Sequence, residues 1–251
     1  MNRDAYIASP LPHEAALLRL FHREDPLVIF DIGSCEGEDS VRYAHLFPSA
    51  RIWAVEPLPE NLERIRANLA RYGIDRVEVV ALALSDSAGQ ATFHVSSGTP
   101  EGAPPGLDWD FGNKSSSLLP PAQHLTAHPW VHFDSAVEVE TGRLDESARR
   151  YGLEGIDYIH MDVQGAELCV LDGAGPLLDS IRVIWMEVEA KPLYKDQPLK
   201  KDVERYMKRH GFEVRLDTVD AVSGDQLYVN TRFYPRSSLR TRVLRRIGLV
   251  K

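Results

Sequence analysis

Cysteines and long apolar runs are scarce in this sequence. Only Cys35 and Cys169 occur among its 251 residues, which excludes a disulfide-stapled scaffold and suits a reducing compartment. No stretch of 18 apolar residues is present, and Arg19 and His22 interrupt the apolar residues near the N-terminus that a signal peptide would need. From these absences we expect a soluble, cytoplasmic protein.

An excess of positive charge is missing as well. The formal net charge is −8, which argues against a sequence-independent grip on nucleic-acid phosphates, so no nucleic-acid partner is expected. The length suits one α/β domain with a small insertion. No internal repeat is visible, and no pattern in the sequence predicts an oligomeric state.

A third absence concerns a glycine-rich loop. Residues 27–37 (LVIFDIGSCEG) form an apolar run that enters a turn with Gly33 and Gly37, and helical spacing follows over 38–47. This pattern predicts a buried strand, a tight loop and a helix N-terminus. The middle glycine of the G-x-G-x-x-G dinucleotide loop is replaced by Cys35 and Glu36, and an acidic side chain would repel a pyrophosphate. An NAD-dependent oxidoreductase is therefore disfavoured.

The same loop suits S-adenosylmethionine, which carries an ammonium group and a ribose but no phosphate. Asp31, at the end of the first strand, can hydrogen-bond an ammonium group. Glu56 ends the second predicted strand, 51–55, and lies 19 residues after Gly37, where an acidic residue meets ribose hydroxyls. Near the third strand, Leu84 can face an adenine ring, and Ser85 and Asp86 either contact its amine or form a plain turn. The predicted cofactor-binding residues are Asp31, Gly33, Ser34, Cys35, Gly37, Glu56, Pro57, Leu84, Ser85, Asp86, Ser116 and Asp162.

Further apolar patterns divide the chain into three parts. We expect an N-terminal helical segment over 1–26 with a helix at 12–23, a main domain over 27–233, and a basic tail over 234–251. Predicted strands lie at 77–82, 90–95, 136–140, 156–161, 181–189, 212–216 and 226–230. The tail is either a docked amphipathic helix or a contact for an anionic lipid surface or lipid-linked substrate.

About 35 residues, from 96 to 130, separate two of these strands and are rich in Gly, Pro and Ser. A loop of this length inside a compact domain is usually functional or disordered, and Trp109 and Trp130 argue against disorder. We predict a lid-like insertion that contacts the substrate through Trp109, Trp130 and His124.

Four motifs together resemble the FkbM family of S-adenosylmethionine-dependent methyltransferases: residues 28–33 with Gly37, residues 55–57 (VEP), residues 115–119 (SSSLL) and residues 162–167 (DVQGAE). The last is the most specific, although Gln164 stands where the family more often has Glu. The resemblance covers residues 27–230 and leaves out the basic tail.

The resemblance implies an α/β, Rossmann-like class I methyltransferase fold. Its seven-stranded, mostly parallel sheet would have the order 3-2-1-4-5-7-6, an antiparallel last pair and helices on both faces. It also implies O-methylation of a hydroxyl on a sugar, glycolipid, polysaccharide or natural product. A Rossmann module that binds the cofactor without chemistry remains an alternative.

Methyl transfer to a weakly nucleophilic hydroxyl needs alignment and benefits from a base or a metal. Asp162 and Glu187 are candidate bases at the carboxyl edge of the sheet, and His160 is either a third candidate or a core side chain. Gln164 and Glu167 are candidate substrate contacts, although Glu167 can instead cap a helix. A competing hypothesis places Mg²⁺ on Asp162, Glu187 and Glu189.

Overall fold

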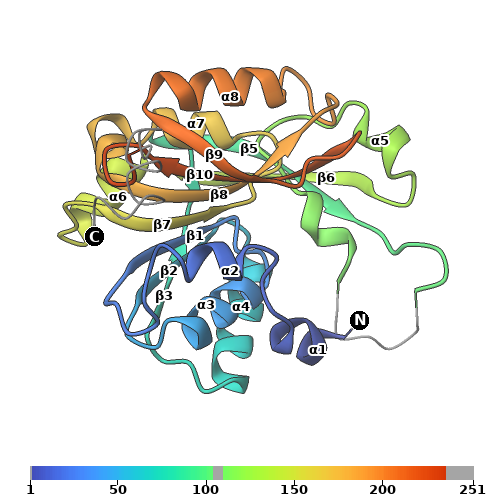
Figure 1. Cartoon of the computed structure of the whole chain (residues 1–251). Helices are drawn as coiled ribbons and strands as arrows, with labels where there is room; N and C mark the ends of the chain where they lie inside the picture. Colours follow the sequence, from blue (N-terminus) through green and yellow to red (C-terminus); the bar gives the residue numbers. More distant parts are fainter. Residues whose placement is uncertain (1, 104–109, 236–251) are drawn as a thin grey trace, which may run out of the picture.

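The computed structural model describes residues 2–103 and 110–235 (Figure 1). Trp109 and residues 236–251 of the predicted tail lie outside the described residues. The main sheet has the order β3-β2-β1-β7-β8-β10-β9, which is 3-2-1-4-5-7-6 when its strands are numbered along the chain. Neighbours are parallel, except that β10 is antiparallel to both β8 and β9. The predicted fold class and strand order are confirmed. The strands are β1 (Val28–Ile32), β2 (Arg51–Glu56), β3 (Val77–Ala81), β7 (Ile156–Met161), β8 (Ile181–Glu189), β9 (Phe212–Asp217) and β10 (Ser223–Asn230).

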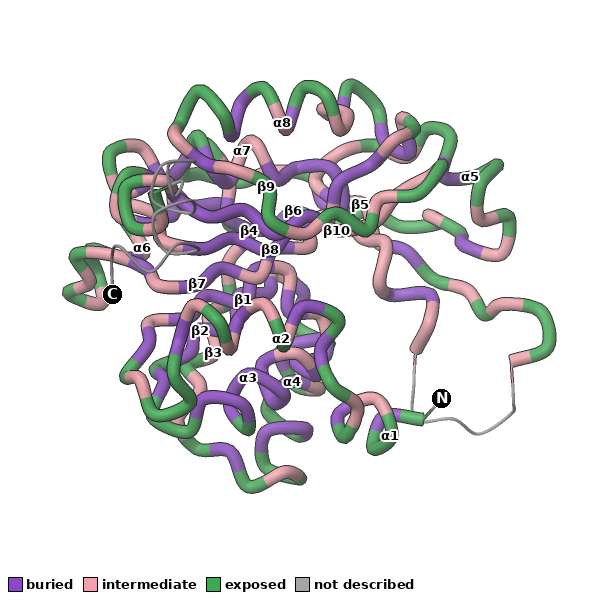
Figure 2. The backbone as a smooth tube through the Cα atoms, viewed as in Figure 1, coloured by how far each residue is buried: buried purple, intermediate pink, exposed green. Residues whose placement is uncertain are grey.

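Helices cover both faces of this sheet (Figure 1). Successive residues of a strand point to opposite faces, so Ile29 of β1 joins one core and Phe30 joins the other. Both are fully buried, and Figure 2 shows purple, buried backbone along the central strands. One face packs against α2 (Glu14–Leu17), α3 (Glu38–Leu46) and α4 (Pro59–Arg71). The other packs against α6 (Leu144–Arg150), α7 (Glu167–Asp172), the 3₁₀ helix η2 (Gly175–Ser180) and α8 (Lys200–Arg209).

The N-terminal segment differs from the predicted helix over 12–23. It forms α1 (Arg3–Ala8), where the Asn2 side chain accepts the Ala5 N–H, and then the single turn α2. After Leu17 the chain continues in turns whose N–H groups bond to carbonyl groups three or four residues back. Leu17 and Phe21 are nevertheless buried in the core against the sheet. The turns therefore bury the same apolar side chains that suggested a helix.

A second sheet has the order β4-β6-β5 and was not predicted. It contains β4 (Ala83–Leu84), β5 (Gly89–Ser97) and β6 (His132–Gly142). The predicted strands at 90–95 and 136–140 are confirmed as parts of β5 and β6, which pair antiparallel. The insertion leaves from the end of β5 and returns at β6, carrying η1 (Gly112–Ser115) and α5 (His124–Ala127).

Two isolated bridges pin the insertion to the rest of the domain. Ser117 pairs with His94 of β5, and Pro121 pairs with Tyr194, which follows β8. The Ser117 hydroxyl also donates to the Gln164 carbonyl at 2.8 Å. The insertion is thereby held over the carboxyl edge of the main sheet. No helix within the described ranges is long and apolar enough to cross a membrane.

Candidate functional site

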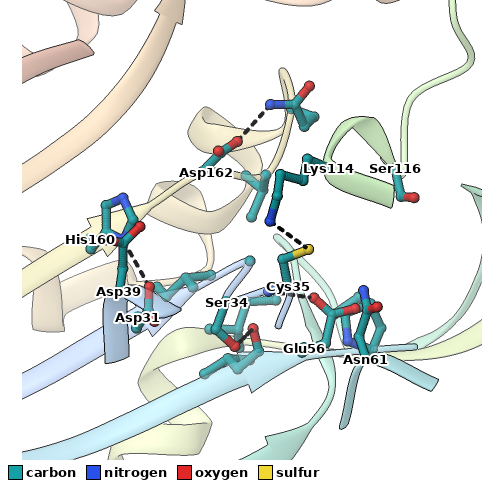
Figure 3. Close-up of a pocket in the computed structure, with 18 of the residues that line it drawn as sticks. Asp31, Ser34, Cys35, Asp39, Glu56, Asn61, Lys114, Ser116, His160 and Asp162 are labelled. Carbon is teal, nitrogen blue, oxygen red and sulfur yellow. Dashed lines mark hydrogen bonds and ion pairs between the residues drawn. The ribbon is translucent and has the colours of Figure 1, made fainter. Parts of the chain in front are cut away.

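A pocket opens where β1, β2 and β7 end, between the main sheet and the insertion (Figure 3). The loop after β1 forms its floor. Gly33 and Gly37 have φ values of 78° and 79°, which glycine adopts without steric cost. A Cβ on Gly33 would lie 1.9 Å from the Asp162 carbonyl oxygen, so the loops after β1 and β7 are packed backbone to backbone.

The pocket contains most of the residues expected to bind cofactor or to act in catalysis, and it contains Gln164, a predicted substrate contact. Those lining it are Asp31, Gly33, Ser34, Cys35, Glu56, Pro57, Leu84, Ser116, His160, Asp162 and Gln164.

Other predicted residues lie outside its lining for identifiable reasons. Gly37 faces α4, where a Cβ would meet the Ile65 side chain at 3.1 Å. The Ser85 N–H is bonded to the Gly142 carbonyl, and Asp86 is exposed to solvent. Neither residue lines the pocket, and contact of either with the adenine amine stays a prediction.

His124 and Trp130 do not reach the pocket. His124 is buried against the rings of Phe133 and Tyr194 at 5.3 and 5.4 Å. Burial, together with the neighbouring His128, lowers the pKa of His124 to about 4. Trp130 lies half-buried beside His128. In the structure both side chains pack the insertion, and substrate contact through them stays a prediction.

Asp31 and His160 form a buried pair at one end of the pocket. The Asp31 carboxylate is 2.8 Å from His160 Nδ1 and accepts the Ser40 hydroxyl at 2.5 Å. Burial lowers the pKa of His160, but the hydrogen bond and charge of Asp31 outweigh it and raise that pKa to about 9. At neutral pH His160 is therefore protonated, and both Asp31 oxygens are engaged by protein groups.

Glu56 ends β2 in the position expected for a ribose contact. Its carboxylate accepts the backbone N–H groups of Cys35 at 3.1 Å and Leu58 at 3.0 Å. Burial nevertheless raises the pKa of Glu56 to about 7. Each carboxylate oxygen can accept a second hydrogen bond, so the group can serve a ligand hydroxyl without losing its backbone partners.

Asp162 lies at the end of β7 and is fixed by its neighbour. Gln164 Nε2 donates to Asp162 at 2.7 Å and to Glu187 at 2.5 Å, while Gln164 Oε1 accepts the Tyr194 hydroxyl at 2.7 Å. Gln164 has a φ of 56°, an uncommon conformation for a residue with a side chain. Gln164 thus orients Asp162, and Glu187 lies behind Gln164 rather than in the pocket lining.

The carboxylates proposed for Mg²⁺ are not arranged as a cation site. Within the described part of the chain, no three His, Cys, Asp or Glu side chains are placed to hold a metal ion. The Gln164 amide bridges Asp162 and Glu187. The third residue, Glu189, is buried, and burial together with the charge of Asp162 raises its pKa to about 7.

Glu167 has a local structural task. Its carboxylate accepts the N–H groups of Val163 at 3.1 Å and Gly165 at 3.3 Å, so it shapes the loop that carries Gln164. Burial and the charge of Glu189 raise the pKa of Glu167 well above its usual value.

Several lining residues were missed from the sequence. Lys114 and Leu118 each lie two residues from Ser116 in the insertion, so proximity to a chosen residue could have suggested them. Phe93, on the predicted strand 90–95, has no chosen residue near it in the sequence. Tyr6 of α1 carries no comparable signal. The additional polar residues are Glu38, Asp39, Asn61 and Asn113.

Comparison with known proteins identifies the family. Residues 31–214 match the model of the methyltransferase FkbM domain. The chain belongs to this family. The 2-O-methyltransferase NoeI of Sinorhizobium fredii is 36% identical over 225 residues, covering 89% of this chain and 87% of NoeI. The methyltransferase sdnD of Sordaria araneosa is 27% identical over 214 residues, covering 76% of each chain.

A search of solved structures returns methyltransferases of low sequence identity. Magnesium protoporphyrin IX methyltransferase (ChlM) from Synechocystis PCC 6803, with bound SAM, is 10% identical; the match covers 91% of this chain and 79% of that one, with a TM-score of 0.48.

This FkbM enzyme is an S-adenosylmethionine-dependent methyltransferase, as the sequence predicted. The pocket fits that cofactor in two respects. Glu56 is a buried carboxylate placed for hydroxyl groups. Glu38 carries a buried oxygen, Oε1, without a hydrogen-bond partner, and lines the same pocket.

Proposed function

We propose that the enzyme methylates a hydroxyl group of a small-molecule acceptor, a sugar, glycolipid, polysaccharide or natural product. The observation that carries this proposal is the carboxylate of Asp162, held by Gln164 in the same pocket as the Gly33 loop and Glu56. The similarity to NoeI, itself named a 2-O-methyltransferase and of similar length, supports an oxygen acceptor.

S-adenosylmethionine would supply a methyl group on a positively charged sulfur, with S-adenosylhomocysteine as the leaving group when the acceptor oxygen attacks the methyl carbon in line. The chain must align that oxygen and receive its proton. Asp162 is the group we assign to the proton, because it lines the pocket and has a fixed orientation. His160 is protonated at neutral pH, so it positions groups by donating a hydrogen bond rather than by acting as the base.

We assign Gln164 and Glu187 to the support of Asp162. The side-chain amide of Gln164 is hydrogen-bonded to Asp162, Glu187 and Tyr194. We therefore expect the acceptor hydroxyl to hydrogen-bond to Asp162 rather than to Gln164. Burial and the charge of Asp162 raise the pKa of Glu187 well above its usual value. Glu187 also lies outside the pocket lining, so we do not assign the proton to it.

The insertion is proposed to cover the acceptor. Lys114, Ser116 and Leu118 bring it into the pocket lining, and exclusion of water protects an activated methyl group.

A cytoplasmic location and lipid contact through the tail stay predictions from the sequence. Both cysteines are free thiols in the structure.

The test is transfer of a labelled methyl group from S-adenosylmethionine to a panel of glycans and hydroxylated small molecules. Asp162→Asn should lower kcat by roughly a hundredfold or more, the usual contribution of a positioned base. Its affinity for S-adenosylhomocysteine should stay within about threefold of wild type, since Asn keeps the shape of the side chain.

Asp179→Asn is the matched control, because Asp179 is exposed and lies outside the pocket lining. Wild-type turnover by Asp162→Asn on an accepted hydroxyl substrate would remove Asp162 as the base. Transfer to no hydroxyl acceptor, with transfer to an amine or thiol, would contradict the proposed reaction itself.

A further inference from the structure

Glu38 holds an unmet hydrogen-bond acceptor in the wall of the pocket. It is the first residue of α3, directly after the Gly33 loop, and its exposed fraction is 4%. Its Oε1 atom has no hydrogen-bond partner. Two cationic atoms lie close to it, Arg3 Nε at 3.6 Å and Lys114 Nζ at 3.7 Å, and both are beyond hydrogen-bond distance. A buried carboxylate oxygen in this state is costly unless a donor arrives.

Asp31, from which the sequence suggested an ammonium contact, is already engaged. Its oxygens are bonded to Ser40 and to the protonated His160. A further ammonium group would meet a carboxylate whose charge is balanced by an adjacent imidazolium. Glu38 is therefore the better placed acceptor for an ammonium group in this pocket.

Lys114 supplies the opposite charge close by. It extends from η1 of the insertion toward Cys35, and Figure 3 shows its amino group between the Gly33 loop and Asp162. Lys114 lines the pocket together with Glu38. Burial lowers the pKa of Lys114, but Cys35 and Glu38 counteract this and the net shift is upward. Lys114 is therefore cationic at neutral pH.

The Glu38 carboxyl group and the Lys114 ammonium group thus stand 3.7 Å apart, too far apart to be hydrogen-bonded. Burial raises the pKa of Glu38, and the charge of Lys114 opposes that shift. A free amino-acid group presents the complementary pair, an ammonium and a carboxylate on one carbon. We propose that Glu38 and Lys114 bind the amino-acid end of S-adenosylmethionine, with Glu38 receiving the ammonium and Lys114 the carboxylate.

This inference rests on the cofactor assignment and is independent of the acceptor. Because Lys114 belongs to the insertion, the proposal also predicts that the insertion takes part in binding the cofactor. The same insertion reaches the loop after β1 through Asn113, whose amide donates to Glu36 at 2.9 Å.

The test compares two ligands that differ in the amino-acid end. S-adenosylhomocysteine carries it, and 5′-methylthioadenosine has the adenine, ribose and thioether without it. Calorimetric titration of the full chain should give a lower Kd for S-adenosylhomocysteine. In Glu38→Gln and in Lys114→Met, the Kd for S-adenosylhomocysteine should rise by roughly tenfold to a hundredfold, the scale of a lost hydrogen bond to a charged group. The Kd for 5′-methylthioadenosine should change by less than about threefold.

Matched controls separate this loss from general damage. Glu60→Gln changes an exposed carboxylate in the first turn of α4, and Lys201→Met changes an exposed lysine of α8. Both should bind the two ligands as wild type does. Glu56→Gln should weaken both ligands, because each carries the ribose. Thermal unfolding, followed by circular dichroism, verifies that each variant is folded.

Equal losses for the two ligands in Glu38→Gln or Lys114→Met, or no loss for either, would overturn the proposal. If a variant fails to fold, the wild-type protein can still test whether the ammonium group of the ligand contributes to binding. The deaminated analogue of S-adenosylhomocysteine should then bind at least about tenfold more weakly than S-adenosylhomocysteine itself, and equal affinity would refute the role of Glu38. No acceptor enters these titrations, so failure of hydroxyl methylation would leave their outcome unchanged.

Discussion

At the scale of single residues, the site is built from buried ionisable side chains that are hydrogen-bonded to other groups of the protein. Asp31 illustrates what sequence can and cannot predict. Its position at the end of a buried strand placed it correctly in the pocket. Its bonds to Ser40, nine residues away, and to His160, 129 residues away, depend on the fold. The ammonium contact inferred from Asp31 alone therefore moves, in our proposal, to Glu38.

The His160–Asp31 pair predicts a dependence of stability on pH. The pKa of His160 is about 9 in the folded chain, against 6.5 for an unperturbed histidine. The folded chain therefore binds the His160 proton more tightly than the unfolded chain does. The contribution of this pair to the free energy of unfolding is complete below pH 6.5 and is lost as the pH rises through 9.

Urea unfolding at pH 6.5 and 9.5 measures this contribution. The wild-type free energy of unfolding should fall between the two pH values by more than that of His160→Gln. Other groups with raised pKa values titrate equally in both proteins and cancel in the difference. The same decrease in both proteins would show that His160 carries no raised pKa.

At the scale of elements, the site is built by loops that follow β1, β2 and β7. These loops were predictable, because strand ends, glycines and the acidic residue after β2 are local features of the sequence. The second sheet was not, since β4 and β6 pair residues more than 50 positions apart. Nothing local to Phe93 indicates that β5 brings its ring into the pocket.

The close packing of two of these loops is itself testable. Gly33→Ala forces a side chain into a positive φ and places its Cβ 1.9 Å from the Asp162 carbonyl oxygen. We expect the free energy of unfolding to drop by about 1–3 kcal/mol or more, with loss of S-adenosylhomocysteine binding. Chemical denaturation checks the first effect and calorimetry the second.

Gly152→Ala is the control for that variant. Gly152 also has a positive φ, 67°, but a Cβ there would meet nothing within 4 Å. Its cost should be limited to the backbone strain, about 1 kcal/mol, with ligand binding intact. If the two variants were equally stable, the steric account of the contact between the loops would be wrong.

At the scale of the whole molecule, the order of the main sheet followed from the resemblance to the FkbM family, and the structure confirms it. No pattern in the sequence predicted which segments meet around the pocket. Glu36, in the loop after β1, binds Arg3 of α1, Arg64 of α4 and Asn113 of the insertion. Three segments distant in sequence meet on one buried carboxylate, and only the folded chain reveals this arrangement.

Our central claim is that this pocket binds S-adenosylmethionine, with Glu56 serving the ribose. Calorimetric titration with S-adenosylhomocysteine, with NAD⁺ as a control ligand, tests it most directly in the wild type and in Glu56→Gln. We predict binding of S-adenosylhomocysteine alone, weakened in Glu56→Gln by roughly 1–3 kcal/mol, the scale of a lost hydrogen bond to a buried group. Binding of NAD⁺ instead, or an affinity for S-adenosylhomocysteine that is indifferent to Glu56, would contradict the claim.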